Sequence, residues 1–144
     1  PAASAETPAA PANPFAIHLE RAVALGKNGP DVVDVAEAKR LMDNGAVLID
    51  VREPREVAQV SIDDSVRLPL PQLSEGDLAG VPVDHDTPIV MICASGVRSL
   101  YAQLLLKAQG YSSVKNVDGG MAAWISAGLP TVRPGEKVGA QPTG

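Results

Sequence analysis

Hydrophobic and polar positions follow one another along the chain in the order that an α/β protein requires. Continuous apolar runs, which suit parallel strands covered on both faces, occur at residues 46–51 and 89–92. Residues 97–108 instead carry apolar side chains three and four positions apart, which is the spacing of a helix packed on a sheet. The predicted strands are 32–33, 46–51, 66–68, 89–92 and 114–117, and the predicted helices lie between Asp34 and Gly45, from Pro54 onward, at 97–108 and at 121–127.

This alternation of strands and helices predicts a mostly parallel sheet with helices on both faces. Helix ends are marked locally: Asp34 with Glu37 three residues later resembles a capping box, and Gly45 ends that helix. Ligands of such sheets bind beyond the carboxyl ends of the strands. Asp50 and Cys93 both end predicted strands, so they fall where a site is expected.

The two ends of the chain differ in composition from its middle. Residues 1–12 are rich in alanine and proline and too poor in large apolar side chains to offset their ordering entropy, which predicts a disordered tail. Asn13 and Pro14 look like an N-cap and a first helical residue, so residues 13–30 are interpreted as a helix and a linker. Residues 134–144 are predicted to form a flexible C-terminal tail.

Length and charge limit the possible roles. The 144 residues fit one domain, and a net charge of −5 argues against nucleic acid as a partner. We expect no membrane span, because nothing approaches the run of about 18 apolar residues that a span needs. The sequence begins at Pro1 without a hydrophobic signal core. We expect a cytoplasmic protein, with a periplasmic location after signal removal as the alternative.

Cys93 is the only cysteine, and its position predicts a nucleophile. It stands where a strand gives way to a short glycine-containing loop and a helix start, and the amide N–H groups and the helix dipole there favour an anion. A thiolate is such an anion and is the reactive form of cysteine. The alternative is a buried, inert thiol. A single cysteine excludes an internal disulfide, and the two widely separated histidines argue against zinc, so we expect no metal and no cofactor.

Charged residues near the predicted strand ends have two interpretations each. Arg98, the only charged residue in the loop, could hold an anionic substrate, or it could pair with a carboxylate such as Asp50 or Asp118. Asp50 and Arg52 are interpreted mainly as structural residues that pin the cysteine loop. The charged residues 53–56 are interpreted as a solvated helix start.

Three motifs together resemble the single-domain rhodanese family. They are Leu-Ile-Asp-Val-Arg-Glu at 48–53, Cys-Ala-Ser-Gly-Val-Arg-Ser at 93–99, and Asp-Gly-Gly-Met-Ala-Ala-Trp at 118–124 followed by Gly-Leu-Pro at 128–130. They occur in the order and at the elements expected for that family, over about residues 31–132. Residues 31–133 are therefore predicted to form a rhodanese-like domain, preceded by a helix outside the family core.

The resemblance implies a five-stranded α/β sheet and a sulfurtransferase. Such an enzyme moves a sulfane sulfur from a small anionic donor such as thiosulfate to a thiol or cyanide acceptor, and a protein acceptor is also possible. It implies that the nucleophile carries the sulfur as a persulfide. The predicted site comprises Cys93 as catalytic residue, Ala94, Ser95, Gly96, Val97 and Arg98 as the persulfide-binding loop, and Asp50, Arg52 and Ser99 as supporting residues.

Two segments depart from the family pattern. Residues 60–65 read Val-Ser-Ile-Asp-Asp-Ser where many members have Gly-His-Ile-Pro-Gly-Ala, which changes the turn and the surface beside it. Ala94 and Ser95 stand where some thiosulfate-using members carry basic residues. The second departure argues against thiosulfate as the natural donor.

Two other functions are compatible with a lone loop cysteine. Cysteine phosphatases, some of which share this fold, have five residues between cysteine and arginine, but position 99 is serine and only four residues separate Cys93 from Arg98. The shorter loop suits one sulfur atom better than a tetrahedral phosphate. The other alternative is a sulfur-carrier or regulatory module without turnover, for which Asp63, Asp64 and the N-terminal helix could provide docking surface.

Overall fold

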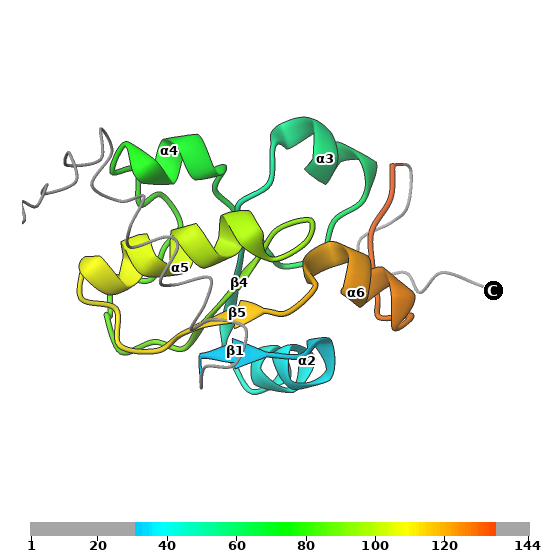
Figure 1. Cartoon of the computed structure of the whole chain (residues 1–144), viewed down its shortest axis with the longest axis horizontal. Helices are drawn as coiled ribbons and strands as arrows, with labels where there is room; N and C mark the ends of the chain where they lie inside the picture. Colours follow the sequence, from blue (N-terminus) through cyan, green and yellow to red (C-terminus); the bar gives the residue numbers. More distant parts are fainter. Residues whose placement is uncertain (1–30, 135–144) are drawn as a thin grey trace, which may run out of the picture.

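A computed structural model of the chain describes residues 31–134 (Figure 1). The predicted tail at 1–12, the helix and linker at 13–30 and all but the first residue of the C-terminal tail lie outside the described residues. The strands are β1 (Val32–Val33), β2 (Val47–Asp50), β3 (Val66–Arg67), β4 (Ile89–Ile92) and β5 (Val114–Val117), and the helices are α2 (Val35–Asp43), α3 (Pro54–Gln59), α4 (Leu70–Ser74), α5 (Val97–Ala108) and α6 (Gly120–Ser126).

The five strands form one parallel sheet in the order β1-β5-β4-β2-β3. The predicted five-stranded α/β fold is therefore confirmed. β4 is the central strand, and its last residue, Ile92, is in register with Asp50 of β2. The residues that follow these two strands consequently leave the sheet at the same edge, which brings the segment after Asp50 beside the cysteine loop.

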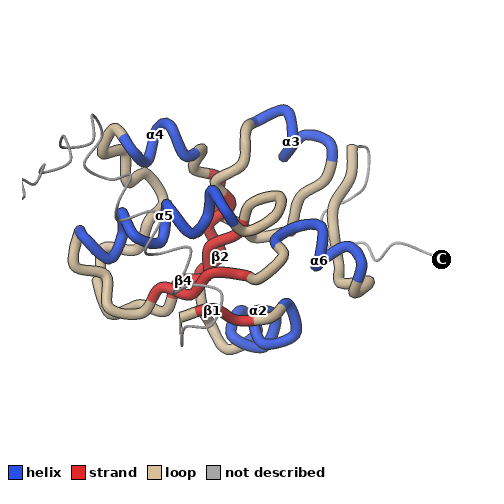
Figure 2. Tube along the Cα trace, in the orientation of Figure 1, coloured by secondary structure: helices blue, strands red, loops and turns tan. Residues whose placement is uncertain are grey.

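Helices cover both faces of the sheet (Figure 2). Ile89 and Met91 of β4 pack in a core with α4 and α5, whereas Val90 and Ile92 pack on the other face with α2 and α6. Successive side chains of a strand point to opposite faces, so burial on both sides requires a continuous apolar run. This requirement explains the unbroken run at 89–92 that predicted the central strand.

Most predicted elements are observed within one or two residues of their expected ends. Asp34 caps α2 as expected, with its side chain accepting a hydrogen bond of 2.8 Å from the Glu37 amide. The helix α4 was missed, because its five residues, Leu-Pro-Gln-Leu-Ser, are too short for a helical apolar period and contain a proline. Only Leu73 of α4 is buried.

The start of α6 fixes the backbone that follows β4. The amides of Met121 and Ala122 donate hydrogen bonds of 2.8 and 3.1 Å to the carbonyl oxygens of Cys93 and Ala94. Gly120 has φ +56°, and a Cβ added there would lie 2.8 Å from the carbonyl carbon of Ala94. Glycine at this position lets α6 pack directly against the cysteine loop.

Replacing Gly120 with alanine should therefore destabilise the fold more than the same change at Gly128. Both residues have positive φ, but a Cβ at Gly128 would meet nothing within 4 Å. Backbone strain should cost about 1 kcal/mol in each variant, and overlap with the loop should add about 1–3 kcal/mol in Gly120→Ala. Urea unfolding measures both losses, and equal losses would contradict the proposed packing.

Candidate active site

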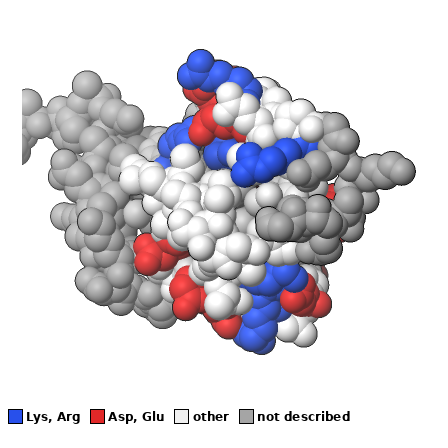
Figure 3. All heavy atoms as spheres, turned by 90° about the vertical axis from the view of Figure 1, so that its right-hand side faces the viewer, with Lys and Arg blue, Asp and Glu red and all other residues white. Residues whose placement is uncertain are grey.

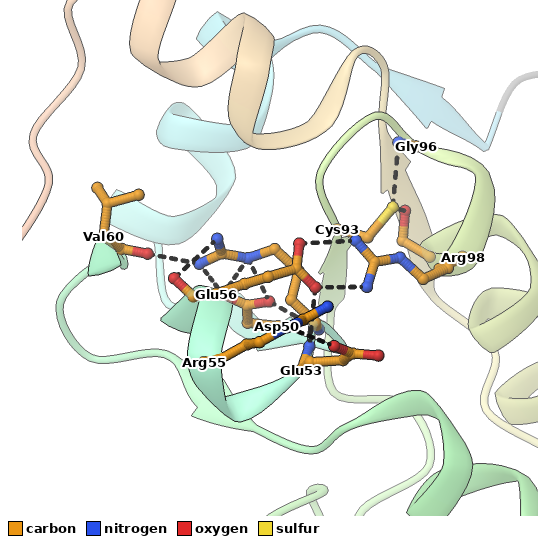
Figure 4. Close-up of polar contacts among 10 residues, drawn as sticks. Asp50, Glu53, Arg55, Glu56, Val60, Cys93, Gly96 and Arg98 are labelled. Carbon is orange, nitrogen blue, oxygen red and sulfur yellow. Dashed lines mark hydrogen bonds and ion pairs between the residues drawn. The ribbon is translucent and has the colours of Figure 1, made fainter. Parts of the chain in front are cut away.

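The Cys93 sulfur is held inside the loop that connects β4 to α5. Cys93 is only 1% exposed. The Gly96 amide donates to its Sγ over 3.1 Å, and the Ser99 hydroxyl lies 3.3 Å from the same atom. Gly96 has φ +105°, and this left-handed conformation turns the chain back over the sulfur and into α5. Figure 4 shows the sulfur directed toward Gly96, with Arg98 beside it.

The loop lowers the pKa of the Cys93 thiol below its ordinary value. Burial is the largest single influence and opposes ionisation. Hydrogen bonds from the Ser99 side chain and from the amides of Ser99, Gly96 and Ser95 act in the other direction and together outweigh burial. These donors favour the charged form of the sulfur, which is the nucleophilic form.

Arg98 pairs with Glu56 and not with either carboxylate suggested by the sequence. Its two terminal nitrogens lie 2.7 and 2.9 Å from the two carboxylate oxygens of Glu56, which makes the pair bidentate. The two side chains are 34% and 29% exposed. The interpretation of residues 53–56 as a merely solvated helix start was therefore wrong for Glu56, which reaches across from α3 to the cysteine loop (Figure 4).

Glu56 also stabilises the start of its own helix. Its carboxylate accepts a hydrogen bond of 3.1 Å from the Glu53 amide, as one half of a capping box. The hydrogen bond from Arg98 is the main cause that lowers the pKa of Glu56 to about 2, against an opposing effect of burial. Glu56 is therefore charged at neutral pH, and it neutralises the only charged residue of the loop.

Asp50 and Arg52 form a buried ion pair behind α3. They are 1% and 4% exposed, and the Arg52 Nη2 lies 2.8 Å from the Asp50 carboxylate. Arg52 also donates to the carbonyl oxygen of Val60 over 2.7 Å, and to that of Glu56 over 3.5 Å. These bonds link the pair to α3, the helix on which Glu56 lies, and not to residues 93–99 as the sequence suggested.

Asn116 is a site residue that the sequence analysis missed. It is 4% exposed on β5, next to the central strand. Its amide nitrogen donates to the Gly96 carbonyl over 3.0 Å, and its amide oxygen lies 2.6 Å from the Ser99 hydroxyl. The one local signal for it is a polar residue between Lys115 and Val117 on the strand that follows the cysteine loop and its helix.

Among the loop residues 94–98, Arg98 alone has a cationic side chain. Ala94 is half-buried, Ser95 is exposed and Val97 is 57% exposed. On the molecular face shown in Figure 3, acidic and basic side chains gather together near the upper and lower edges, with uncharged atoms between them. This face therefore presents mixed charge instead of a continuous basic surface.

Other kinds of site find little support within residues 31–134. No group of three or more His, Cys, Asp or Glu side chains there could hold a metal ion. None of the helices in that range has the length and apolarity needed to cross a bilayer. A cavity of about 270 Å³ lies between α2 and α6, away from Cys93, and Asp63 and Asp64 are among its lining residues.

Comparison with known proteins identifies the family. The rhodanese-like domain family model matches residues 34–127. A protein named sulfurtransferase from Allochromatium vinosum is 42% identical over 98 residues, which cover 67% of this chain and 89% of that protein. Thiosulfate sulfurtransferase GlpE from Pseudomonas syringae is 38% identical over 88 residues, covering 61% of this chain and 80% of GlpE.

A solved structure agrees with these relatives. The rhodanese-related protein from Thermoplasma volcanium has a TM-score of 0.62 at 31% identity, covering 70% of this chain and 96% of its own. An α/β domain with a cysteine loop at the end of its central strand defines the class, and the chain belongs to the rhodanese family. The family match and the named relatives identify it as a rhodanese-type sulfurtransferase.

The Glu56–Arg98 pair should contribute stability that depends on pH. The pKa of Glu56 falls from 4.5 to about 2 on folding, so the contribution is complete above 4.5 and is lost as the pH falls toward about 2. Glu56→Gln should therefore destabilise the protein at neutral pH, and the difference from wild type should shrink on acidification. Urea unfolding at a series of pH values measures this. In an Arg98→Ala background the pH dependence should be much weaker, and an equal dependence would contradict the assignment.

Proposed function

We propose that the enzyme transfers a sulfane sulfur through a persulfide on Cys93. With thiosulfate as donor, the Cys93 thiolate attacks the outer sulfur, a new S–S bond forms, and sulfite leaves with the electrons of the old S–S bond. The acceptor, a thiol or cyanide, then attacks the carried sulfur, and the Cys93 thiolate is released. The observation that carries this proposal is the buried Cys93 sulfur, with the Gly96 amide at 3.1 Å and the Ser99 hydroxyl at 3.3 Å.

The same donors suit both halves of the reaction. Negative charge rests on the Cys93 sulfur before the first attack and returns to it when the acceptor takes the outer sulfur away. Hydrogen-bond donors fixed around the position of developing charge stabilise it without having to reorganise. A covalent intermediate of this kind predicts ping-pong kinetics.

Loop length supports sulfur over phosphate as the transferred group. Four residues separate Cys93 from Arg98, and Gly96 folds the chain back so that its own amide points at the sulfur. Arg98, which a phosphatase would use to bind the phosphate oxygens, is bidentate on Glu56. Both observations favour a pocket for one additional sulfur atom.

The charge around Arg98 affects the choice of donor. The sulfonate end of thiosulfate must share Arg98 with Glu56 or displace it, and Ala94 and Ser95 offer no further cation. Thiosulfate is therefore proposed as a usable donor that this site binds weakly. A sulfur donor that does not bind the Arg98 guanidinium would not have to compete with Glu56 for it.

A sulfur-carrier module that transfers only to a bound protein is the second candidate. The 1% exposure of Cys93 favours it, because a sulfur so enclosed is hard for a freely diffusing acceptor to reach. The two functions differ in turnover. A carrier accepts one sulfur and holds it in the presence of cyanide, whereas an enzyme of the proposed kind turns over thiosulfate and cyanide repeatedly.

Incubation with thiosulfate should raise the intact mass of the protein by one sulfur atom. Cyanide should remove this sulfur, and Cys93→Ser, which has a hydroxyl in place of the thiol, should gain none. Intact mass spectrometry before and after cyanide measures both changes. Absence of any gain with thiosulfate and with a thiol persulfide would exclude the proposed function.

Glu56→Gln should improve the use of thiosulfate. Glutamine can preserve the capping box at the start of α3, but it carries no charge to occupy Arg98. Because Arg98 then has no carboxylate partner to give up when thiosulfate binds, kcat/KM for thiosulfate should rise about ten-fold, mainly through a lower KM.

The control is Arg98→Ala combined with Glu56→Gln, in which the improvement should disappear because no guanidinium is available. Steady-state kinetics with cyanide as acceptor compares the variants. An unchanged or higher KM in Glu56→Gln would show that Glu56 does not compete with the donor.

A further inference from the structure

Asn116 is a buried amide whose two ends both hydrogen-bond the cysteine loop. It lies on β5 with 4% exposure. Its nitrogen is 3.0 Å from the Gly96 carbonyl oxygen, and its oxygen is 2.6 Å from the Ser99 hydroxyl. Burial of an amide is costly unless its hydrogen bonds are satisfied. Here they are satisfied by the two residues that also contact the Cys93 sulfur.

The chemistry of these groups fixes the direction of each hydrogen bond. A carbonyl oxygen only accepts, so the NH₂ group of Asn116 must face Gly96 and the amide oxygen must face Ser99. That amide oxygen also only accepts, so the Ser99 hydroxyl must donate to it. The hydroxyl has a single proton. The same hydroxyl also lies within donating distance of the Cys93 sulfur, at 3.3 Å, so its one proton faces two acceptors.

We propose that Asn116 is a positioning residue for Cys93, because its amide oxygen and the ionised sulfur compete for the one hydroxyl proton of Ser99. With a thiol at Cys93, the hydroxyl donates to Asn116. With a thiolate, the hydroxyl turns to the sulfur and its bond to Asn116 opens. The proton stays on Ser99 in both arrangements, so only hydrogen bonds change.

This competition gives Asn116 an effect opposite to that of the other loop contacts. The amides around the sulfur favour the thiolate in every state, whereas Asn116 withholds one donor until the sulfur carries charge. The withheld donor becomes free at the two points of the reaction where charge is on Cys93. This competition acts on the ionisation of Cys93 itself, so it holds for any sulfur donor or acceptor.

Residues 99 and 116 are uncharged, so replacing them removes none of the charged groups near the sulfur. Arg98 of α5 interacts electrostatically with the sulfur and is bound by Glu56 of α3. The buried pair of Asp50 and Arg52 lies at the end of β2, and β5 is followed by the exposed Asp118. α6 carries no charged residue. Substitutions at 99 and 116 therefore test the hydroxyl proton separately from these charges.

The test is a pH titration of the ultraviolet absorbance of the Cys93 thiolate in the full chain, with Cys93→Ser as the baseline. Asn116→Leu has a similar volume but no acceptor for Ser99. Its titration midpoint should move to lower pH, and its thiolate fraction below the midpoint should rise about five-fold. Asn116→Ala is titrated beside it, and thermal unfolding shows which variant is folded.

The decisive comparison is made in a Ser99→Ala background. There, Asn116→Leu should leave the midpoint where Ser99→Ala alone puts it, because no hydroxyl proton remains to be released. The same downward movement in both backgrounds would overturn the proposal, as would an unchanged or higher midpoint in Asn116→Leu itself. Lost turnover with an unchanged midpoint would mean that Asn116 only braces Gly96, which also overturns it. Persulfide loading measured by mass tests the proposed function separately.

Discussion

The structure depends on keeping one sulfur atom buried and still favouring its charged form. Burial alone raises the pKa of a thiol, and at Cys93 it is the largest single influence. The opposing donors belong to a loop that must close tightly, which requires the left-handed Gly96 and the hydrogen bonds from α6 to the carbonyls of Cys93 and Ala94. The parallel sheet places the loop, because the central strand β4 ends at the edge of the sheet where the loop and α5 begin.

The charged side chains around the loop form two ion pairs, one beside the loop and one buried behind α3. Glu56 neutralises Arg98, and the buried pair of Asp50 and Arg52 holds the helix that presents Glu56. Removing either Asp50 or Arg52 would leave an uncompensated buried charge, so each of the two residues requires the other. The local field at the sulfur therefore comes mainly from fixed hydrogen-bond donors, with the only loop cation already occupied.

The sequence allowed the fold to be predicted more completely than the site. Apolar runs and glycine or aspartate helix ends located all five strands, whereas the short α4, with its proline, left no periodic signal. Cys93 and its loop were found because their spacing is local. The roles of Glu56 and Asn116 depend on contacts with residues far away in the sequence, such as Glu56 with Arg98, and no local pattern reports such contacts.

If the loop encloses a persulfide on Cys93, a crystal structure of the protein after exposure to thiosulfate should show it. We expect one additional sulfur atom bonded to the Cys93 Sγ and surrounded by the amides of residues 94–98, with Arg98 still near Glu56. An unmodified Cys93 with an oxyanion bound to Arg98 would show that the loop does not carry a persulfide and would favour phosphate-type chemistry.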